Sequence, residues 1–313
     1  MLKTDQNIFK SIKLISFEKN FNEMINLYDT KNFPRVMLLS GNKGIGKFTL
    51  VFHFLNYIYT KEDNNKYNFK EKSINVNSNF YNLVLNQSFA DVIFFQAAEN
   101  KNIKIEDVRN LKSTLSKTTL TKNPRFIIID EVEFLNTSSA NALLKTLEEP
   151  SGNNFFILID NQQSELIQTI SSRCLKNNIY LNYLQKKKIT DYLIKHNKIN
   201  PFIDNTNTLT PGLLLKYSEL SNKHKIDLNE NILLKLNKLL YAYKKDKDNA
   251  LIKMTFFFIN QFFYQLAIKN ENKIFTLSNL RVNIANKVNN FTLYNLNLNS
   301  VLNSIELQLK NVR

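Results

Sequence analysis

The first 175 residues contain four short apolar runs, which alternate with segments whose apolar residues have helical spacing. They are RVMLLS, DVIFFQ, RFIIIDEVEFL and NFFILID, at residues 35–40, 91–96, 125–135 and 154–160. Continuous apolar runs of this length are typical of strands that are buried on both faces of a parallel sheet. The alternation of strand and helix predicts a doubly wound α/β domain over residues 1–177.

The strand pattern ends near residue 178, and the remaining chain has helical periodicity. LNYLQKKKITDYLIKH and PGLLLKYSEL have the spacing of short helices, and longer helical patterns follow them. We therefore predict a small helical lid over residues 178–220. An all-α C-terminal domain, expected to mediate oligomerisation, is predicted over residues 221–313.

Two other segments complete the predicted layout. Residues 7–30 have helical spacing, whereas residues 61–88, rich in Asn and Lys, predict a loop or a poorly ordered insertion. The most apolar run, MTFFFINQFFYQLAI, is too short and too rich in amides to span a bilayer, so it predicts a buried helix. A single cysteine, Cys174, and an early Asp5 without an apolar leader favour a cytoplasmic location.

The positive charge of the chain has two interpretations. The 313 residues carry a formal net charge of +15, which is typical of nucleic-acid partners. The chain is also rich in Asn, Lys, Ile, Phe and Tyr throughout, and such a bias raises the charge without concentrating it on one face. A DNA-facing patch and a composition bias both remain open.

Glycine is scarce in this chain, and its placement is informative. Three of the five glycines lie in GNKGIGKF, residues 41–48, directly after an apolar run and before a helical pattern. Strand, glycine loop and helix form the context of a phosphate-binding loop, in which backbone N–H groups approach an oxyanion. The residues that would form it are Gly41, Gly44, Gly46 and Lys47, with the lysine reaching the phosphates.

The loop departs from the phosphate-binding pattern at its last position. The pattern requires a Ser or Thr hydroxyl as a Mg²⁺ ligand, and this chain has Phe48 there. A phenyl ring at this position would crowd the metal. Thr49 comes one residue late, about 100° further round the helix, and is a poor substitute.

Paired acids end the third apolar run. Asp130 is placed where an acidic residue would hold Mg²⁺, and Glu131 where it would polarise a water molecule. An equally weighted interpretation is a solvated strand end without a metal. The three histidines are scattered without ligand spacing, so no metal site is predicted from them.

Three motifs in this order carry a family resemblance. GNKGIGK, FIIIDEVEFLNTSSANALLKTLEEP and TISSRC resemble the clamp-loader branch of the AAA+ ATPases, and within it the delta-prime family of bacterial DNA polymerase III. The resemblance implies a P-loop domain of AAA+ type, a lid and a helical collar. It also implies a place in the polymerase III holoenzyme, in a hetero-pentamer with gamma/tau motor subunits and a delta subunit. That complex loads the sliding clamp onto primer–template DNA.

The resemblance also assigns roles to single residues. Arg173 in the S-R-C motif would act in trans at a neighbour's ATP site; a structural salt bridge is the alternative interpretation. Asp160 and Asn161 fall where motor subunits carry a polar sensor. The lid motif that begins at Pro211 continues with Leu213 instead of a sensing arginine. The paired cysteines that bind zinc in many relatives are absent, so no zinc is expected.

These departures predict a nucleotide-binding scaffold that has lost its own hydrolysis. Whether ATP is bound without hydrolysis stays open. Two rival functions remain: an active motor ATPase of the gamma/tau type, and a stand-alone nucleic-acid-binding protein that uses the positive charge.

Overall fold

A computed structural model describes residue 9 and residues 11–96, 103–115, 123–197, 209–227 and 229–310. The chain divides into two compact units. The first comprises Met1–Lys198 and Asn207–Leu213, and the second comprises Ile199–Thr206 and Leu214–Arg313. The predicted three-part division with boundaries at 177 and 220 stays a prediction, and residues 198–208 of the predicted lid lie outside the described residues.

A five-stranded parallel sheet forms the centre of the first unit. Its strands, in the spatial order β2-β3-β4-β1-β5, are β1 (Val36–Ser40), β2 (Val92–Gln96), β3 (Arg125–Asp130), β4 (Asn154–Asp160) and β5 (Leu175–Asn178). The four predicted strands are confirmed. The apolar runs of β1, β3 and β4 are buried between helices on both faces, whereas the edge strand β2 is only partly buried. The fifth, LKNN, was missed: it is a mostly exposed edge strand and has no apolar run.

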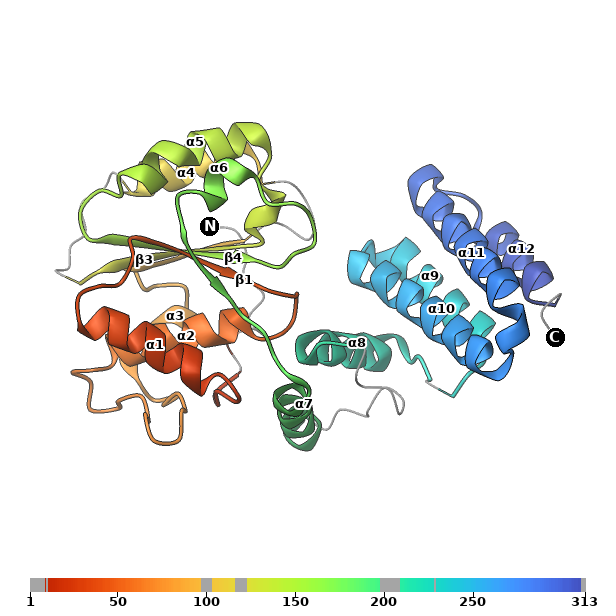
Figure 1. Cartoon of the computed structure of the whole chain (residues 1–313), viewed down its shortest axis with the longest axis horizontal. Coiled ribbons are helices and arrows are strands. Elements are labelled where there is room, and N and C mark those ends of the chain that lie inside the picture. The colour runs from red at the N-terminus through yellow and green to blue at the C-terminus, as the bar shows by residue number, and fades with distance from the viewer. Residues whose placement is uncertain are drawn as a thin grey trace. The chain divides into compact units, whose positions relative to one another are not determined.

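Helices cover both faces of this sheet (Figure 1). On one face lie α1 (Glu18–Asp29), α2 (Lys47–Tyr59) and α3 (Asn79–Leu85). On the other lie α4 (Ile105–Leu115), α5 (Thr137–Glu148) and the short α6 (Gln168–Ser171). The 3-10 turn η2 (Val132–Phe134) follows β3, and α7 (Tyr183–Asn197) follows β5. The doubly wound α/β architecture is therefore confirmed.

Two predictions for the amino-terminal part were only partly right. The predicted helix at 7–30 begins only at Glu18, and its residues 7, 8 and 10 lie outside the described part. The segment 61–88, predicted as a loop or a poorly ordered insertion, is a loop of turns up to residue 78 and then contains α3, and it is hydrogen-bonded to the chain before α1. The Lys72 carbonyl accepts from the Leu14 N–H at 2.8 Å, and the Lys72 ammonium lies 3.2 Å from the Phe69 ring centroid.

A buried histidine on α2, His53, joins the segment 61–88 to the chain before α1. The His53 Nε2 lies 2.9 Å from the Ser11 carbonyl oxygen, which can only accept, so Nε2 carries the proton. The Nδ1 then accepts from the Tyr67 hydroxyl at 2.8 Å. Burial lowers the pKa of His53 to about 4, so the ring is neutral at physiological pH.

This depressed pKa predicts acid sensitivity. Between about pH 6.5 and 4 the unfolded chain binds a proton at His53 and the folded chain does not, so stability falls as pH falls. We expect the free energy of unfolding to drop by about 2 kcal/mol from this group between pH 7.5 and 5. Urea unfolding at both pH values measures it. His53→Gln should remove the difference, and Tyr67→Phe, which keeps the titrating ring, should retain it; equal pH dependence in all three proteins contradicts the prediction.

The second unit is helical, as predicted for the C-terminal region. Its helices are α8 (Pro211–His224, whose first three residues belong to the first unit), α9 (Ile232–Asp246), α10 (Asn249–Lys269), α11 (Ile274–Tyr294) and α12 (Leu298–Lys310), with a 3-10 turn η3 (Glu271–Lys273). Helix α10 is long and apolar enough to cross a membrane by length and composition alone. Its side chains Phe258, Ile259 and Phe263 are buried within the unit, which is the behaviour of a core helix.

Candidate functional site

The carboxyl ends of the central strands bring the predicted site residues to one edge of the sheet. The register pairs Ser40 at the end of β1 with Asp160 at the end of β4, and Gln96 at the end of β2 with Asp130 at the end of β3. The glycine loop 41–46 leaves β1 at the same edge. This edge is where open parallel sheets bind ligands.

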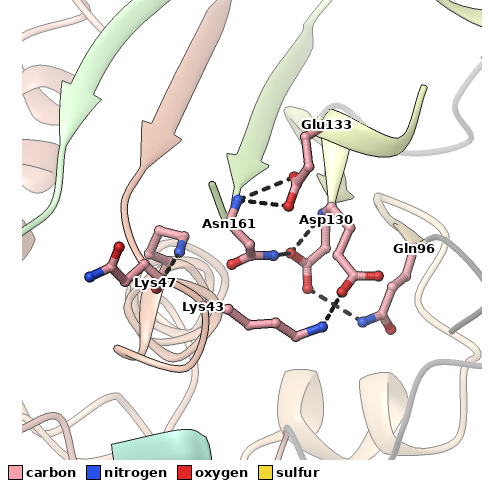
Figure 2. Close-up of polar contacts among 8 residues, drawn as sticks. Lys43, Lys47, Gln96, Asp130, Glu133 and Asn161 are labelled. Atoms are coloured by element: carbon pink, nitrogen blue, oxygen red, sulfur yellow. Dashed lines mark hydrogen bonds and ion pairs between the residues drawn. The ribbon is translucent and has the colours of Figure 1, made fainter. Parts of the chain in front are cut away.

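The loop lysine is bonded to its own loop. Gly46, with φ of 110°, caps α2, and Lys47 is the first residue of that helix. The Lys47 ammonium donates to the carbonyl oxygens of Gly41 at 2.5 Å and Asn42 at 3.0 Å. Burial lowers the pKa of Lys47 to about 8. Figure 2 shows this side chain turned onto the loop.

A second segment of the same unit packs directly on the loop. The Gly212 N–H donates to the Gly44 carbonyl oxygen at 2.7 Å, and the Thr210 hydroxyl donates to the Lys43 carbonyl oxygen at 2.7 Å. Gly44 has φ of 80°, and a Cβ there would lie 2.5 Å from the Thr210 Oγ1. A Cβ on Gly212 would lie 2.8 Å from the Gly44 carbonyl oxygen. Both glycines are therefore required by contact between two pieces of this chain.

The other two loop glycines also face protein atoms. A Cβ on Gly41 would lie 2.4 Å from the Ile179 carbonyl oxygen, in the connection between β5 and α7. A Cβ on Gly46, where φ is 110°, would lie 3.1 Å from the Phe17 ring. The loop is a junction of several chain segments, and its glycines have a packing role whether or not a phosphate is bound.

Phe48 is packed among aromatic side chains. Its ring centroid lies 5.7 Å from that of Phe9, 5.6 Å from that of Phe94 and 6.5 Å from that of Phe52. Offset and edge contacts at these distances stabilise aromatic clusters. The ring thus belongs to the core on the α2 face of the sheet, which the sequence did not predict. Thr49 is half-buried in the first turn of α2.

The acid that ends β3 is held by three donors. The Asp130 carboxylate accepts from the Asn161 Nδ2 at 3.0 Å, from the Glu131 N–H at 2.8 Å and from the Gln96 Nε2 at 3.4 Å. Figure 2 shows Asp130 between Asn161 and Gln96. Burial, reinforced by the charge of Glu131, raises the pKa of Asp130 to about 6.

The neighbouring acids, Glu131 and Glu133, also have partners within the chain. Glu131 is buried, has a left-handed backbone with φ of 59°, and forms an ion pair with Lys43. A non-glycine residue in this region is strained, and such strain clusters at functional sites. The Glu133 carboxylate accepts from the Asn161 N–H at 3.1 and 3.2 Å, and burial raises the pKa of Glu133. Neither Asp130 nor Glu131 is a freely solvated strand end.

Arg173 lies apart from this edge, just after α6. Its guanidinium forms an ion pair with Glu148 at the end of α5, with N–O distances of 2.5 Å. It also donates to the Thr169 carbonyl oxygen at 2.8 Å. Both charged side chains are partly exposed, at 32% for Arg173 and 44% for Glu148. The arginine therefore has an internal partner that competes with any partner outside the chain.

Cys174 has the environment of a core residue. It packs against the hydrophobic cluster on the α5 face, and burial raises the pKa of its thiol to about 11. A thiol with a raised pKa is a weak nucleophile. Among the residues that the structure describes, no group of three or more His, Cys, Asp or Glu side chains could hold a metal ion.

The structure thus gathers Lys47, Asp130 and Asn161 at the edge where β1, β3 and β4 end. It adds side chains that the sequence did not single out: Lys43, Gln96 and Glu133. Gln96 ends a strand, so its position was a usable signal. The pairing of Lys43 with Glu131 spans 88 residues and has no local signal.

The fold and this edge define the class of protein: a P-loop domain of the AAA+ type, joined to a helical C-terminal region. The sequence profile of the family described as DNA polymerase III, delta subunit, matches residues 17–182. The chain belongs to that family, and the predicted delta-prime resemblance is confirmed.

Individual relatives agree with this assignment. The delta' subunit of DNA polymerase III from Pseudomonas aeruginosa is 40% identical over 76 residues, 24% of this chain and 23% of the relative. The delta' subunit from Buchnera aphidicola subsp. Schizaphis graminum is 28% identical over 211 residues, 67% and 60% of the two chains. The chain thus spans less than two thirds of the length of either relative. A gamma subunit-related protein from Thermotoga maritima shares the fold, with a TM-score of 0.52 and 16% identity over 93% of this chain and 99% of that one.

Proposed function

We propose that this chain is the delta-prime-type subunit of a DNA polymerase III clamp-loader complex in the cytoplasm, and that it does not hydrolyse ATP itself. In this proposal it assembles with gamma/tau motor subunits and a delta subunit, and meets the sliding clamp and primed DNA through the complex. It presents Arg173 to a neighbouring ATP site. Family membership supports the complex, and the packing of Phe48 is the observation that carries the loss of hydrolysis.

The residues at the sheet edge support the proposed loss of hydrolysis. Phe48 replaces the hydroxyl that would bind the metal, and its ring is packed with Phe9 and Phe94. The Lys47 ammonium is bonded to two carbonyl oxygens of its own loop. Glu131, the acid placed to polarise a water molecule, is ion-paired with Lys43. Phosphoryl transfer depends on the metal, the lysine and that acid together.

The isolated chain should therefore show negligible ATP hydrolysis, far below about 1 per second, with Mg²⁺-ATP and primed DNA. A coupled phosphate-release assay on the purified chain measures it. Lys47→Ala is the matched control, because turnover that survives this change comes from a contaminant. Turnover near 1 per second that depends on Lys47 would instead establish the alternative, a motor ATPase of the gamma/tau type.

The second unit offers an apolar surface for assembly. Where α10 passes through η3 into α11, four large apolar side chains are exposed: Tyr264 at 57%, Ile268 at 59%, Ile274 at 54% and Phe275 at 80%. We call them the α10–α11 patch. Clustered exposed apolar residues mark interaction surfaces, and we assign this patch to contacts with the other subunits.

Phe275→Asp should weaken assembly at least about ten-fold without unfolding the chain, because a charge in the middle of a buried contact must be desolvated. Size-exclusion chromatography with light scattering, on mixtures with gamma/tau and delta subunits, measures the complex. Leu307→Asp, on α12 and 65% exposed, is the matched control and should assemble normally. If the chain forms no complex with these subunits, the proposed function fails; if Phe275→Asp assembles like wild type, the assignment of the patch fails.

A further inference from the structure

Aromatic and basic side chains are exposed side by side after the edge strand β5. Tyr180 is 71% exposed, Tyr183 is 57% exposed and Leu184 is 74% exposed. Lys176 on β5 and Lys187 and Lys188 on α7 are exposed beside them in the chain. We call these six residues the tyrosine–lysine surface. It lies within the first compact unit and shares no residue with the sheet-edge site.

Hydrogen bonds at the start of α7 fix the backbone that carries this surface. Asn182 and Gln185 form a reciprocal cap at the start of α7, with side chain-to-backbone hydrogen bonds of 2.8 and 3.0 Å. The Gln185 side chain also donates to the Ser16 carbonyl oxygen at 3.1 Å. Leu181 and Ile189 pack against the core, whereas Tyr183 and Leu184 between them are exposed.

The spacing of the side chains suits an extended chain of bases. Tyr180 and Tyr183 are three residues apart, so their Cα atoms lie within about 10 Å of each other. Lys187 follows Tyr183 by one helical turn, and Lys188 follows Leu184 by the same interval, so each lysine is next to an exposed apolar side chain.

The charged residues around this surface in the sequence are all basic. From Leu166 to Thr190 the sequence has five basic residues and no acidic ones. The whole chain has 27 acidic residues in 313, so a stretch of this length would contain about two on average. Acid-free stretches also occur at residues 30–61 and 272–305, so the feature particular to this surface is the placement of three exposed lysines near two exposed tyrosines, which is favourable for a polyanion.

We propose that the tyrosine–lysine surface binds single-stranded DNA, with bases stacked on the two tyrosines and phosphates beside the lysines. Sequence-tolerant binding to single strands combines aromatic platforms with a basic track in this way. A protein partner is disfavoured, because lysine is depleted in protein interfaces. A duplex hides its bases from such platforms. The choice of DNA over RNA rests on the proposed function.

Fluorescence anisotropy of a labelled (dT)15 oligonucleotide with the full-length chain, without nucleotide or other subunits, tests this. We expect a dissociation constant on the order of 1 to 100 µM at low salt, and a log–log salt slope of about −2 from the three lysines. Tyr180→Ala and Tyr183→Ala should each weaken binding about ten-fold, whereas the Phe variants should bind like wild type. Changing Lys187 and Lys188 together to Ala should reduce the slope to about −0.7.

Tyr241→Ala and Tyr294→Ala, at exposed tyrosines of the helical unit (65% and 71%), are the matched controls and should bind normally. Photo-crosslinking of a 5-bromodeoxyuridine oligonucleotide should map to residues 176–188. The proposal is overturned if (dT)15 does not bind, if a duplex of equal length binds more tightly, or if the Tyr180 and Tyr183 variants bind like the controls. Tighter binding of (rU)15 than of (dT)15 overturns the assignment to DNA. These outcomes are independent of assembly and clamp loading, which test the proposed function.

Discussion

Arg173→Ala should slow ATP hydrolysis at the neighbouring subunit's site by about 10³-fold while the complex still assembles. A guanidinium can spread its charge over two γ-phosphate oxygens, and arginines of this type contribute about 10³ to 10⁵ in rate in related phosphoryl transfers. Lysine has a compact ammonium and no planar fork, so Arg173→Lys should recover little of the rate. The measurement is single-turnover hydrolysis in a reconstituted complex in which only the neighbouring site has an intact loop lysine.

The ion pair with Glu148 separates this role from a structural one. If Arg173 serves only to join α5 to α6, then Glu148→Gln removes the same contact and should have the same consequences as Arg173→Ala. If Arg173 acts on a neighbour, Glu148→Gln removes a competitor and should leave hydrolysis at that site unchanged or faster. The partly exposed pair contributes about 0–1 kcal/mol to stability, so neither variant should unfold the chain.

The control is the thermal midpoint of each isolated variant, which should stay close to that of the wild type. Equal hydrolysis by the Arg173→Ala and wild-type complexes would remove the trans role from the proposal. Loss of hydrolysis in the Glu148→Gln complex would favour the structural interpretation.

Burial decided which strands the sequence could predict. The strands β1, β3 and β4 lie inside the sheet with helices on both faces, so their side chains form continuous apolar runs. The strand β5 pairs only with β1 at the sheet edge, and LKNN has no pattern that marks it as a strand. The start of α1 was misplaced because residues 11–17 include buried apolar side chains, such as Leu14 and Phe17, without forming a helix.

The site was predicted where its residues follow strands, and missed where its contacts are long-range. Asp130 ends β3 and Asn161 follows β4, and parallel pairing of these strands brings them to one edge. The ion pair between Lys43 and Glu131, the internal bonds of Lys47 and the ring contacts of Phe48 depend on side-chain directions in the folded chain. No spacing rule in the sequence encodes those directions.

Gly44→Ala should destabilise the nucleotide-free chain by about 3 kcal/mol. A left-handed backbone costs a non-glycine residue roughly 1–2 kcal/mol, and overpacking adds about 1–3 kcal/mol. The new methyl group would lie 2.5 Å from the Thr210 Oγ1 and 3.0 Å from the Leu213 backbone nitrogen, so one of these segments must move. The free energy of unfolding from urea titrations, without any nucleotide, is the measurement.

Gly152→Ala isolates the contact from the backbone strain. Gly152 also has a positive φ, of 60°, but a Cβ there meets nothing within 4 Å, so this variant should lose only about 1 kcal/mol. In the Gly44→Ala background, Thr210→Ala removes the nearest atom and should recover part of the loss, which a double-mutant cycle measures as coupling. A glycine kept only for phosphate binding predicts equal costs at positions 44 and 152 and no coupling to Thr210. Unequal costs with coupling would show that the loop is retained as a packing junction, which explains how its glycines persist beside Phe48 in a chain with only five of them.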